Sequence, residues 1–128
     1  MMAKLERSPQ PARMEAVSRD ALVQAALQEI NQNYREASLS NVARAYGVSL
    51  AYVSECVRAQ TGRTYKELLQ KHRMETAARL LRRSDLNIQQ IITQVGYENT
   101  SYFYRLFHER YGQSPREYRN ARQRRPHA

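Results

Sequence analysis

The sequence predicts an all-α fold, with two helix-turn-helix subdomains joined by a long linker helix and about seven helices in all. Three observations support this prediction. Apolar residues recur at three- and four-residue spacings over most of the chain. Gly and Pro number only four each, too few for the many turns of a β-sandwich or barrel. A pattern of cap, short helix, glycine turn, second cap and second helix occurs twice, with Gly47 and Gly96 49 positions apart.

The N-terminal subdomain is predicted over residues 18–63. It follows a leader at 1–17, which has no apolar period and contains the run Ser8-Pro9-Gln10-Pro11, so we expect a mobile arm there. Ser18 has the side chain of an N-cap. Apolar residues then recur at four-residue steps and predict one buried helix face: Leu22, Ala26, Ile30 and Tyr34.

The first helix-turn-helix pattern begins after this helix. Ser38 is predicted to cap a short helix that ends at Gly47, and Ser49 a second helix over 50–60 that stops at Gly62. The inward-facing residues expected in the two helices are Leu39, Val42, Ala43, Leu50, Val53 and Val57.

The linker helix is predicted within residues 64–84. Thr64 and Glu67 have the spacing of a capping box, in which a hydroxyl and a carboxylate satisfy two backbone donors. The helix itself is expected over 65–83, and its apolar face includes His72, which we interpret as a core residue and not as a ligand. The other residues of that face are Tyr65, Leu68, Leu69, Ala77, Leu80 and Leu81.

The C-terminal subdomain is predicted over residues 85–121 and repeats the pattern. Asn87 with Gln90 forms a second capping box, and Asn99 caps a helix over 100–111. Ser114, Pro115 and Glu117 open a short last helix, before a basic tail at 122–128. The expected core residues are Ile88, Ile91, Ile92, Val95, Phe103, Phe107, Tyr111 and Tyr118.

The net charge of +9 is unevenly distributed. Residues 1–37 hold five Lys or Arg and five Asp or Glu, residues 38–86 hold nine against four, and residues 87–128 hold seven against three. The excess therefore lies in the two repeat-bearing segments and favours a polyanionic partner. A membrane partner is not expected, because no apolar run has spanning length and no signal sequence is present. The single Cys56 suits a reducing cytoplasm.

Double-stranded DNA is the polyanion that this layout favours. In a helix-turn-helix the second helix enters the major groove, and residues near its N-terminal end contact the bases. The outward-facing residues of the two second helices include Tyr52, Arg58 and His108 besides the base-reading candidates, which are Ala51, Ser54, Glu55, Thr100, Ser101, Tyr104 and Arg105.

Arg105 and Glu55 occupy equivalent positions in the two copies. The guanidinium of Arg105 can hold both acceptors of guanine, although it could instead pair with Glu109 on the helix surface. The carboxylate of Glu55 can accept a hydrogen bond from cytosine, or it could bond Arg58 or Arg79 and have only a structural role. Both alternatives stay open for each residue.

Phosphate contacts are expected from basic side chains and from the capped helix starts at Ser38, Asn87 and Ser114. The candidates among the side chains are Arg44, Arg63, Lys66, Arg116 and Arg119.

Catalysis, a metal and a cofactor are not expected. His72, His108 and His127 have no ligand spacing with one another or with Cys56, and no nucleotide loop, nucleophile motif or carboxylate pair is present. We interpret Cys56 as a small, semi-buried filler, and we expect no small-molecule ligand in this chain.

The segment from about Asp20 to Arg119 resembles the DNA-binding domain of the AraC/XylS family of bacterial transcription regulators. The strongest similarity lies in residues 95–119, with their Gly-Tyr, Ser-Tyr-Phe-Tyr-Arg-Leu-Phe, Gly-Gln-Ser-Pro and Tyr-Arg elements in the family's order and spacing. The run Arg73-Met-Glu-Thr-Ala-Ala-Arg-Leu-Leu81 in the linker helix also matches.

The resemblance implies that the helices at 50–60 and 100–111 occupy successive major-groove segments of one duplex, with the base-reading candidates named above. It also implies contact with RNA polymerase beside a promoter. An Arg is common in the family where Glu55 stands and a Phe where Val57 stands, so we expect the first copy to read bases less directly than the second. The chain is interpreted as either a stand-alone regulator or, with slight preference, the C-terminal domain of a longer one.

Two other functions remain as alternatives. The chain could be the DNA-reading module of a repair protein whose Cys56 accepts alkyl groups, or a basic module that binds a protein or RNA.

Overall fold

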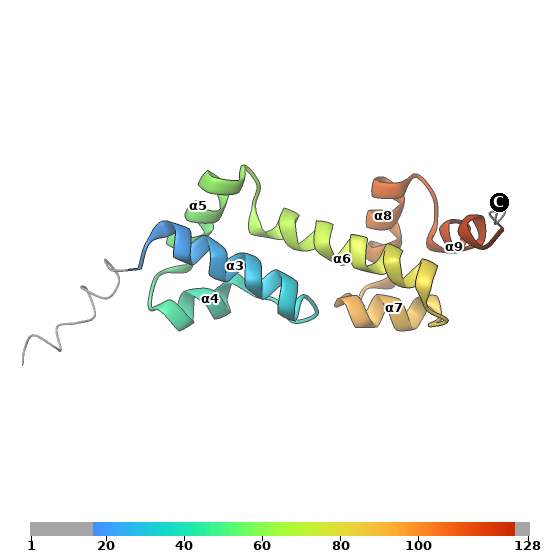
Figure 1. Ribbon diagram of the computed structural model, residues 1–128, viewed down its shortest axis with the longest axis horizontal. Helices are drawn as coiled ribbons and strands as arrows, with labels where there is room; N and C mark the ends of the chain where they lie inside the picture. The colour runs from blue at the N-terminus through green and yellow to red at the C-terminus, as the bar shows by residue number, and fades with distance from the viewer. Residues whose placement is uncertain (1–16, 125–128) are drawn as a thin grey trace, which may run out of the picture. The chain divides into compact units, whose positions relative to one another are not determined.

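The computed structural model describes residues 17–124, and within this range it contains seven α-helices and no strand (Figure 1). The all-α prediction is therefore confirmed. The predictions for residues 1–16 and 125–128 lie outside the described residues. The helices are α3 (Arg19–Asn33), α4 (Leu39–Tyr46), α5 (Leu50–Thr61), α6 (Tyr65–Arg83), α7 (Ile88–Val95), α8 (Thr100–Tyr111) and α9 (Pro115–Arg124).

The helix starts follow the capping chemistry that the sequence predicts. At α6, the Thr64 N–H donates to Glu67 Oε1 at 2.9 Å and the Glu67 N–H donates to Thr64 Oγ1 at 3.1 Å. The same reciprocal bonds join Asn87 with Gln90 before α7. They also join Ser114 with Glu117 at α9. Each pair satisfies two backbone donors that a helix start leaves free.

Four helices end at a glycine in the left-handed region, namely α4, α5, α7 and α8. Gly96, after α7, is the one whose surroundings add a second requirement. Its φ is +105°, and a Cβ at this position would lie 2.7 Å from the carbonyl oxygen of Arg35 and 2.9 Å from the guanidinium of Arg73. Both the backbone angle and the space therefore restrict this position to glycine.

The described chain divides into two compact units. Unit 1 consists of residues 17–33 and 37–69, and unit 2 of residues 34–36 and 70–124. The boundary falls inside α6, between Leu69 and Gln70. The five-part division from the sequence, at 1–17, 18–63, 64–84, 85–121 and 122–128, stays a prediction.

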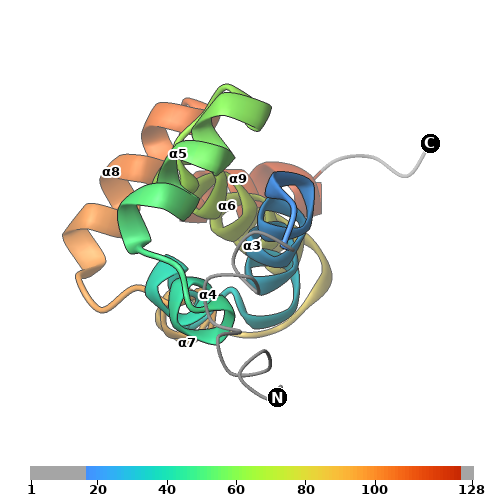
Figure 2. The ribbon, with the colours of Figure 1, turned by 90° about the vertical axis from the view of Figure 1, so that its left-hand side faces the viewer.

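In unit 1, α3 packs against α4 and α5 around an apolar core (Figure 2). Two residues of α5 differ from their prediction. Cys56 is fully buried and not semi-buried. Leu50 was predicted to face the core, but 49% of it is exposed. It is the first residue of α5, and because side chains tilt toward the N-terminus of a helix, it extends past the core that Val53 and Val57 fill.

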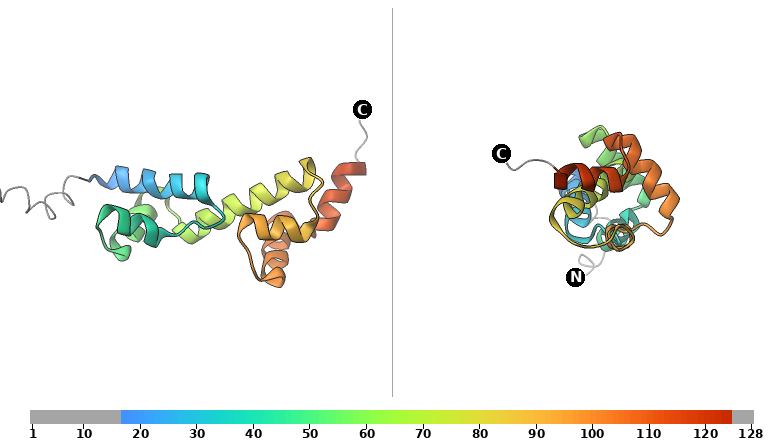
Figure 3. Two further views of the ribbon diagram at one scale, coloured as in Figure 1. Left: turned by 90° about the horizontal axis from the view of Figure 1, so that it is seen from below. Right: turned by 90° about the vertical axis from the view of Figure 1, so that its right-hand side faces the viewer.

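Helices α6, α7 and α8 surround the core of unit 2, and α9 packs at its edge (Figure 3). Aromatic and aliphatic side chains fill this core. Phe103 and Phe107 are fully buried, with ring centroids 5.9 Å apart. The ring of Phe107 also lies 4.6 Å from that of Tyr111 and 5.5 Å from that of Tyr118. These contacts hold the inner face of α8, so its outer face has a fixed orientation within the unit.

The short segment 34–36 belongs to unit 2. Helix α3 ends at Asn33, so Tyr34 does not continue the buried face of that helix as predicted. The Tyr34 ring instead lies 5.3 Å from the ring of His72. Arg73 donates from Nε to the carbonyl oxygen of Tyr34 at 2.9 Å and from Nη2 to that of Arg35 at 3.2 Å. Its guanidinium also lies 5.1 Å from the centroid of the Tyr97 ring.

Candidate nucleic-acid interface

The start of α5 presents exposed side chains directly after a tight turn. Gly47 ends α4, and the Ser49 hydroxyl caps α5 by accepting a hydrogen bond from the N–H of Tyr52 at 3.0 Å. The predicted base-reading residues of this helix are all exposed: Ala51, Ser54 and Glu55. Since Val53, Cys56 and Val57 are buried, the first two turns of α5 have one core face and one open face.

The start of α8 repeats this geometry. Gly96 ends α7, and the Asn99 side chain caps α8 by accepting from the N–H of Tyr102 at 2.9 Å. Ser101, Tyr104 and Arg105 are exposed, as expected for base-reading residues. Thr100 is half-buried, and its hydroxyl donates to Gln89 Oε1 at 3.3 Å, which ties the start of α8 to α7.

Arg105 is oriented by two neighbours on its own helix. Its Nη1 lies 3.6 Å from Glu109 Oε2, and its guanidinium carbon lies 5.1 Å from the Tyr102 ring centroid. The Tyr102 hydroxyl in turn accepts from the Gln70 amide on α6 at 2.7 Å. The ring beneath the guanidinium is therefore anchored to a second helix of the same unit.

The pairing with Glu109, one of the two interpretations of Arg105, is thus present in the structure. Its strength decides whether it competes with base contact. Both side chains are more than half exposed, and such a pair one turn apart contributes only about 0.3–0.5 kcal/mol. A bidentate contact with guanine discriminates by about 1–3 kcal/mol. The pair can therefore give way to a base, and Arg105 remains a base-reading candidate.

Glu55 makes neither of the two contacts considered for a structural role. The ion pairs between described residues are Lys71–Glu75 and Arg105–Glu109, and no hydrogen bond in this part of the chain involves the Glu55 side chain. The carboxylate is exposed on the open face of α5. The pairing with Arg58 or Arg79 is therefore not found, and acceptance from a base remains as the proposed role.

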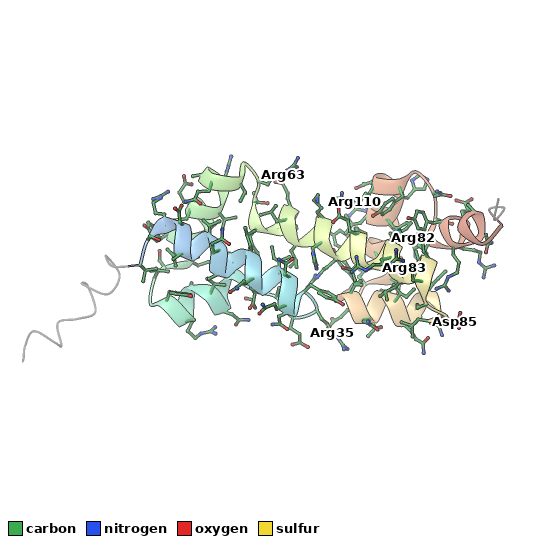
Figure 4. The ribbon with its side chains drawn as sticks, in the orientation of Figure 1. Arg35, Arg63, Arg82, Arg83, Asp85 and Arg110 are labelled. Carbon is green, nitrogen blue, oxygen red and sulfur yellow. The ribbon has the colours of Figure 1, made fainter. Side chains whose placement is uncertain are left out.

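The five predicted phosphate contacts fall into two groups. Arg44, Arg63, Lys66 and Arg116 are exposed, and Figure 4 shows Arg63 at the connection between α5 and α6. Arg119 is half-buried and caps the end of α6. It donates to the carbonyl oxygens of Leu80, Leu81 and Ser84 at 3.0–3.5 Å. These bonds use Nε and Nη2 and leave the Nη1 donors available, so Arg119 stays a phosphate candidate with the other four.

A hollow of about 440 Å³ adjoins the open face of α8. It joins Tyr104, a predicted base-reading residue, to Arg116, a predicted phosphate contact. The remaining lining residues are Asn87, Ile88, Arg119 and Asn120. Asn120 was not singled out from the sequence, because an Asn in a polar terminal helix has no distinguishing pattern.

Cys56 is 0% exposed, so its thiol has no access to solvent in this state. His72 is half-buried, and burial lowers the pKa of its imidazole. No group of three His, Cys, Asp or Glu that could hold a metal ion is found among the described residues. None of the described helices is both long and apolar enough to cross a membrane.

A family profile described as a helix-turn-helix domain matches residues 42–121, which include both glycine turns and the helices α5 and α8 that follow them. The chain belongs to the AraC/XylS helix-turn-helix family. Among its AraC/XylS-type relatives, the transcriptional activator NphR from a Rhodococcus species is 37% identical over 92 residues, which are 70% of this chain and 27% of NphR. The chain spans 5–35% of the length of eight curated relatives that it matches.

Solved structures of this family have the same fold. The C-terminal domain of AraT, a response regulator from Geobacillus stearothermophilus, is 33% identical with a TM-score of 0.75, covering 88% of this chain and 96% of that chain. A DNA-binding transcriptional dual regulator from Escherichia coli K-12 is 27% identical with a TM-score of 0.71, covering 81% of this chain and 94% of that chain.

Proposed function

We propose that this chain is the sequence-specific, double-stranded DNA-binding part of an AraC/XylS-type transcription regulator and that it has no enzymatic activity of its own. Helices α5 and α8 are the recognition helices in this proposal. They enter successive major-groove segments of one duplex, about one helical turn apart, or roughly 34 Å.

The observation that carries the proposal is the repeated geometry of α5 and α8. Each helix follows a left-handed glycine and an N-cap, buries one face in its own unit and exposes the other. This is the arrangement in which a helix-turn-helix inserts the start of its second helix into the major groove. The positive charge of the two repeat-bearing segments supplies the attraction to phosphates.

The proposed contacts divide by chemistry. Base edges are read by Ala51, Ser54 and Glu55 in the first unit and by Thr100, Ser101, Tyr104 and Arg105 in the second. The guanidinium of Arg105 holds guanine, and the carboxylate of Glu55 accepts from the amino group of cytosine. Phosphates are bound by the exposed Arg44, Arg63, Lys66 and Arg116, and by the Nη1 donors of the half-buried Arg119.

The proposal also includes a protein partner and a location in the cell. The family resemblance supports contact with RNA polymerase beside a promoter. A cytoplasmic location, on the nucleoid when the protein is bound, follows from a chromosomal DNA partner and suits the single cysteine. The alkyl-accepting alternative is not supported, because Cys56 is fully buried.

Selection from random duplex DNA tests the function. The full chain is bound to the library, and the retained duplexes are sequenced. We expect two enriched segments whose centres lie about one helical turn apart. The selected duplex is then compared with structured RNA over a salt titration. Enrichment of no sequence, or tighter binding to RNA at every salt concentration, would contradict the proposal.

A further inference from the structure

The two recognition helices begin with residues of opposite character. Leu50 is the first residue of α5, and Thr100 is the first residue of α8, at the equivalent position after the cap. Thr100 is half-buried and donates a hydrogen bond to Gln89. Leu50 is 49% exposed, the largest exposed fraction among the large hydrophobic residues that remain exposed in the described chain.

The neighbours of Leu50 on the open face of α5 offer few hydrogen-bond donors. The Ser49 hydroxyl already serves as the cap, and Ala51 has no polar side-chain atom. The next outward residues are Tyr52, which is 39% exposed, the short Ser54 and the acceptor Glu55. The first two residues of α5 therefore present a branched aliphatic side chain and a methyl group, where the first two residues of α8 present hydroxyls.

The major groove has one apolar group at its base edges, the C5-methyl group of thymine. Guanine, adenine and cytosine present polar acceptors and donors there. We propose that Leu50, together with Ala51, selects thymine by contact with its methyl group. This inference rests on the proposed function, because it requires α5 to lie in the major groove.

The position of Leu50 on α5 favours contact with thymine over contact with a protein partner. Leu50 stands directly beside Ala51 and one turn before Ser54, so it shares the open face that the helix-turn-helix geometry turns toward bases. Exposed basic side chains lie on α4 and α5 of unit 1, among them Arg44 and Arg58. A duplex is the ligand that offers phosphates to such side chains and methyl groups to the leucine.

The proposal explains how the first unit can specify sequence without an arginine at the position of Glu55. Thymine is chosen by apolar contact, and cytosine by the carboxylate. Each contacted methyl group adds about three- to fivefold to affinity, because that is the effect of burying one such group.

The test uses uracil, which differs from thymine only in lacking the methyl group. Duplexes selected by the full chain are remade with a single thymine replaced by uracil at each position in turn, and their dissociation constants are measured. For the unaltered chain, we expect one or more positions in the segment bound by unit 1 at which uracil weakens binding about three- to fivefold. The DNA segment bound by unit 1 is identified as the one that the Arg105→Ala variant still protects in a footprinting experiment.

Two variants of Leu50 provide the matched comparison. Leu50→Thr installs the residue of the second unit, and we expect it to reduce the uracil effect at those positions, because only Ala51 and a shorter side chain remain to contact the methyl group. Leu50→Met keeps an apolar side chain and should keep most of the uracil effect. Arg105→Ala, in the other unit, should weaken binding without removing that effect. Thermal unfolding of each variant confirms that the comparison is made on folded protein.

The outcomes separate the inference from the proposed function. Enriched sequences with no uracil-sensitive position in the unit 1 segment, or with equal sensitivity in the unaltered chain and Leu50→Thr, would overturn the role of Leu50 alone. Enrichment of no sequence would remove the proposed function and this inference with it.

Discussion

Arg105 Nη1 lies 3.6 Å from Glu109 Oε2, and the same guanidinium lies over the ring of Tyr102, with 5.1 Å between its carbon and the ring centroid. The ring is anchored in turn by the Gln70 amide. These contacts restrict the orientations of a long side chain before any ligand is bound. Less conformational entropy is then lost when the side chain contacts a base.

We expect Arg105→Ala to weaken binding to a selected duplex by about 1–3 kcal/mol, with a much smaller loss on unrelated duplexes. Fluorescence anisotropy at fixed salt concentration measures both. Glu109→Ala is the matched control: it removes the ion pair but keeps the guanidinium, and its effect should stay within about 0.5 kcal/mol. An equal loss on selected and unrelated DNA for Arg105→Ala would assign Arg105 to phosphate binding.

Gly96 and Gly112 both have left-handed backbones, but only Gly96 lacks space for a side chain. Gly112→Ala should destabilise the protein by about 1–2 kcal/mol, the cost of a left-handed conformation for an L-residue. Gly96→Ala should lose about 1–3 kcal/mol more, because its Cβ would displace the Arg35 carbonyl or Arg73. Urea denaturation of both variants measures the difference. Equal losses would show that residues 34–36 and Arg73 move away from the added Cβ without loss of stability.

Arg73 makes two hydrogen bonds to backbone carbonyls and one contact with an aromatic ring. Lysine cannot reproduce this set, since it lacks the planar fork of donors. We expect Arg73→Lys to lower the free energy of unfolding by about 1–3 kcal/mol. The exposed Lys71→Ala is the control and should change it by no more than about 0.5 kcal/mol. Similar values for the two variants would contradict a structural role for Arg73.

The pKa of His72 is lowered from its ordinary value of 6.5, first by burial and then by Arg79 and Lys71, against an opposing effect of Glu75. Burial disfavours the charged imidazole, so the unfolded chain binds a proton more readily than the folded one. The contribution of His72 to stability is therefore complete above the unfolded pKa and is lost as the pH falls below about 6.5. Urea midpoints across this range should decrease toward acid in the unaltered protein and less in His72→Gln. An identical pH dependence in the two proteins would exclude His72 as a source of the loss of stability at acid pH.

Cys56 is the only thiol in the chain and is fully buried. We expect it to react with a thiol reagent only as fast as unit 1 opens, and rapidly in denaturant. Exposure to alkylated duplex DNA should leave the thiol count unchanged. Transfer of an alkyl group to Cys56 under native conditions would restore the repair hypothesis.

The helices and their starts were predictable because their causes are local. Thr64 with Glu67 and Asn87 with Gln90 are separated by one turn, and their capping bonds depend on no other part of the chain. The buried faces followed from periodicity for the same reason, as Phe103 and Phe107 show.

The features that the sequence did not predict depend on where a core ends or on contacts distant in sequence. Leu50 continues the apolar spacing of α5 but lies past the end of the core. No local pattern indicates that Arg119 also caps the end of α6, more than thirty residues earlier. Similarly, nothing in the spacing around Tyr34 predicts that its carbonyl oxygen accepts a hydrogen bond from Arg73, 39 positions away.

The membership of residues 34–36 in unit 2 limits how this protein can be dissected. Unit 2 is discontinuous in the chain, so no single cut separates it from unit 1. A fragment that begins at residue 70 would keep Arg73 but lose the carbonyl oxygens of Tyr34 and Arg35 that it binds. Any excised C-terminal half therefore differs from unit 2, because the half-buried Arg73 guanidinium has lost these carbonyl acceptors. We expect the DNA affinity of such a fragment to be lower than the affinity that the same helices have in the intact chain.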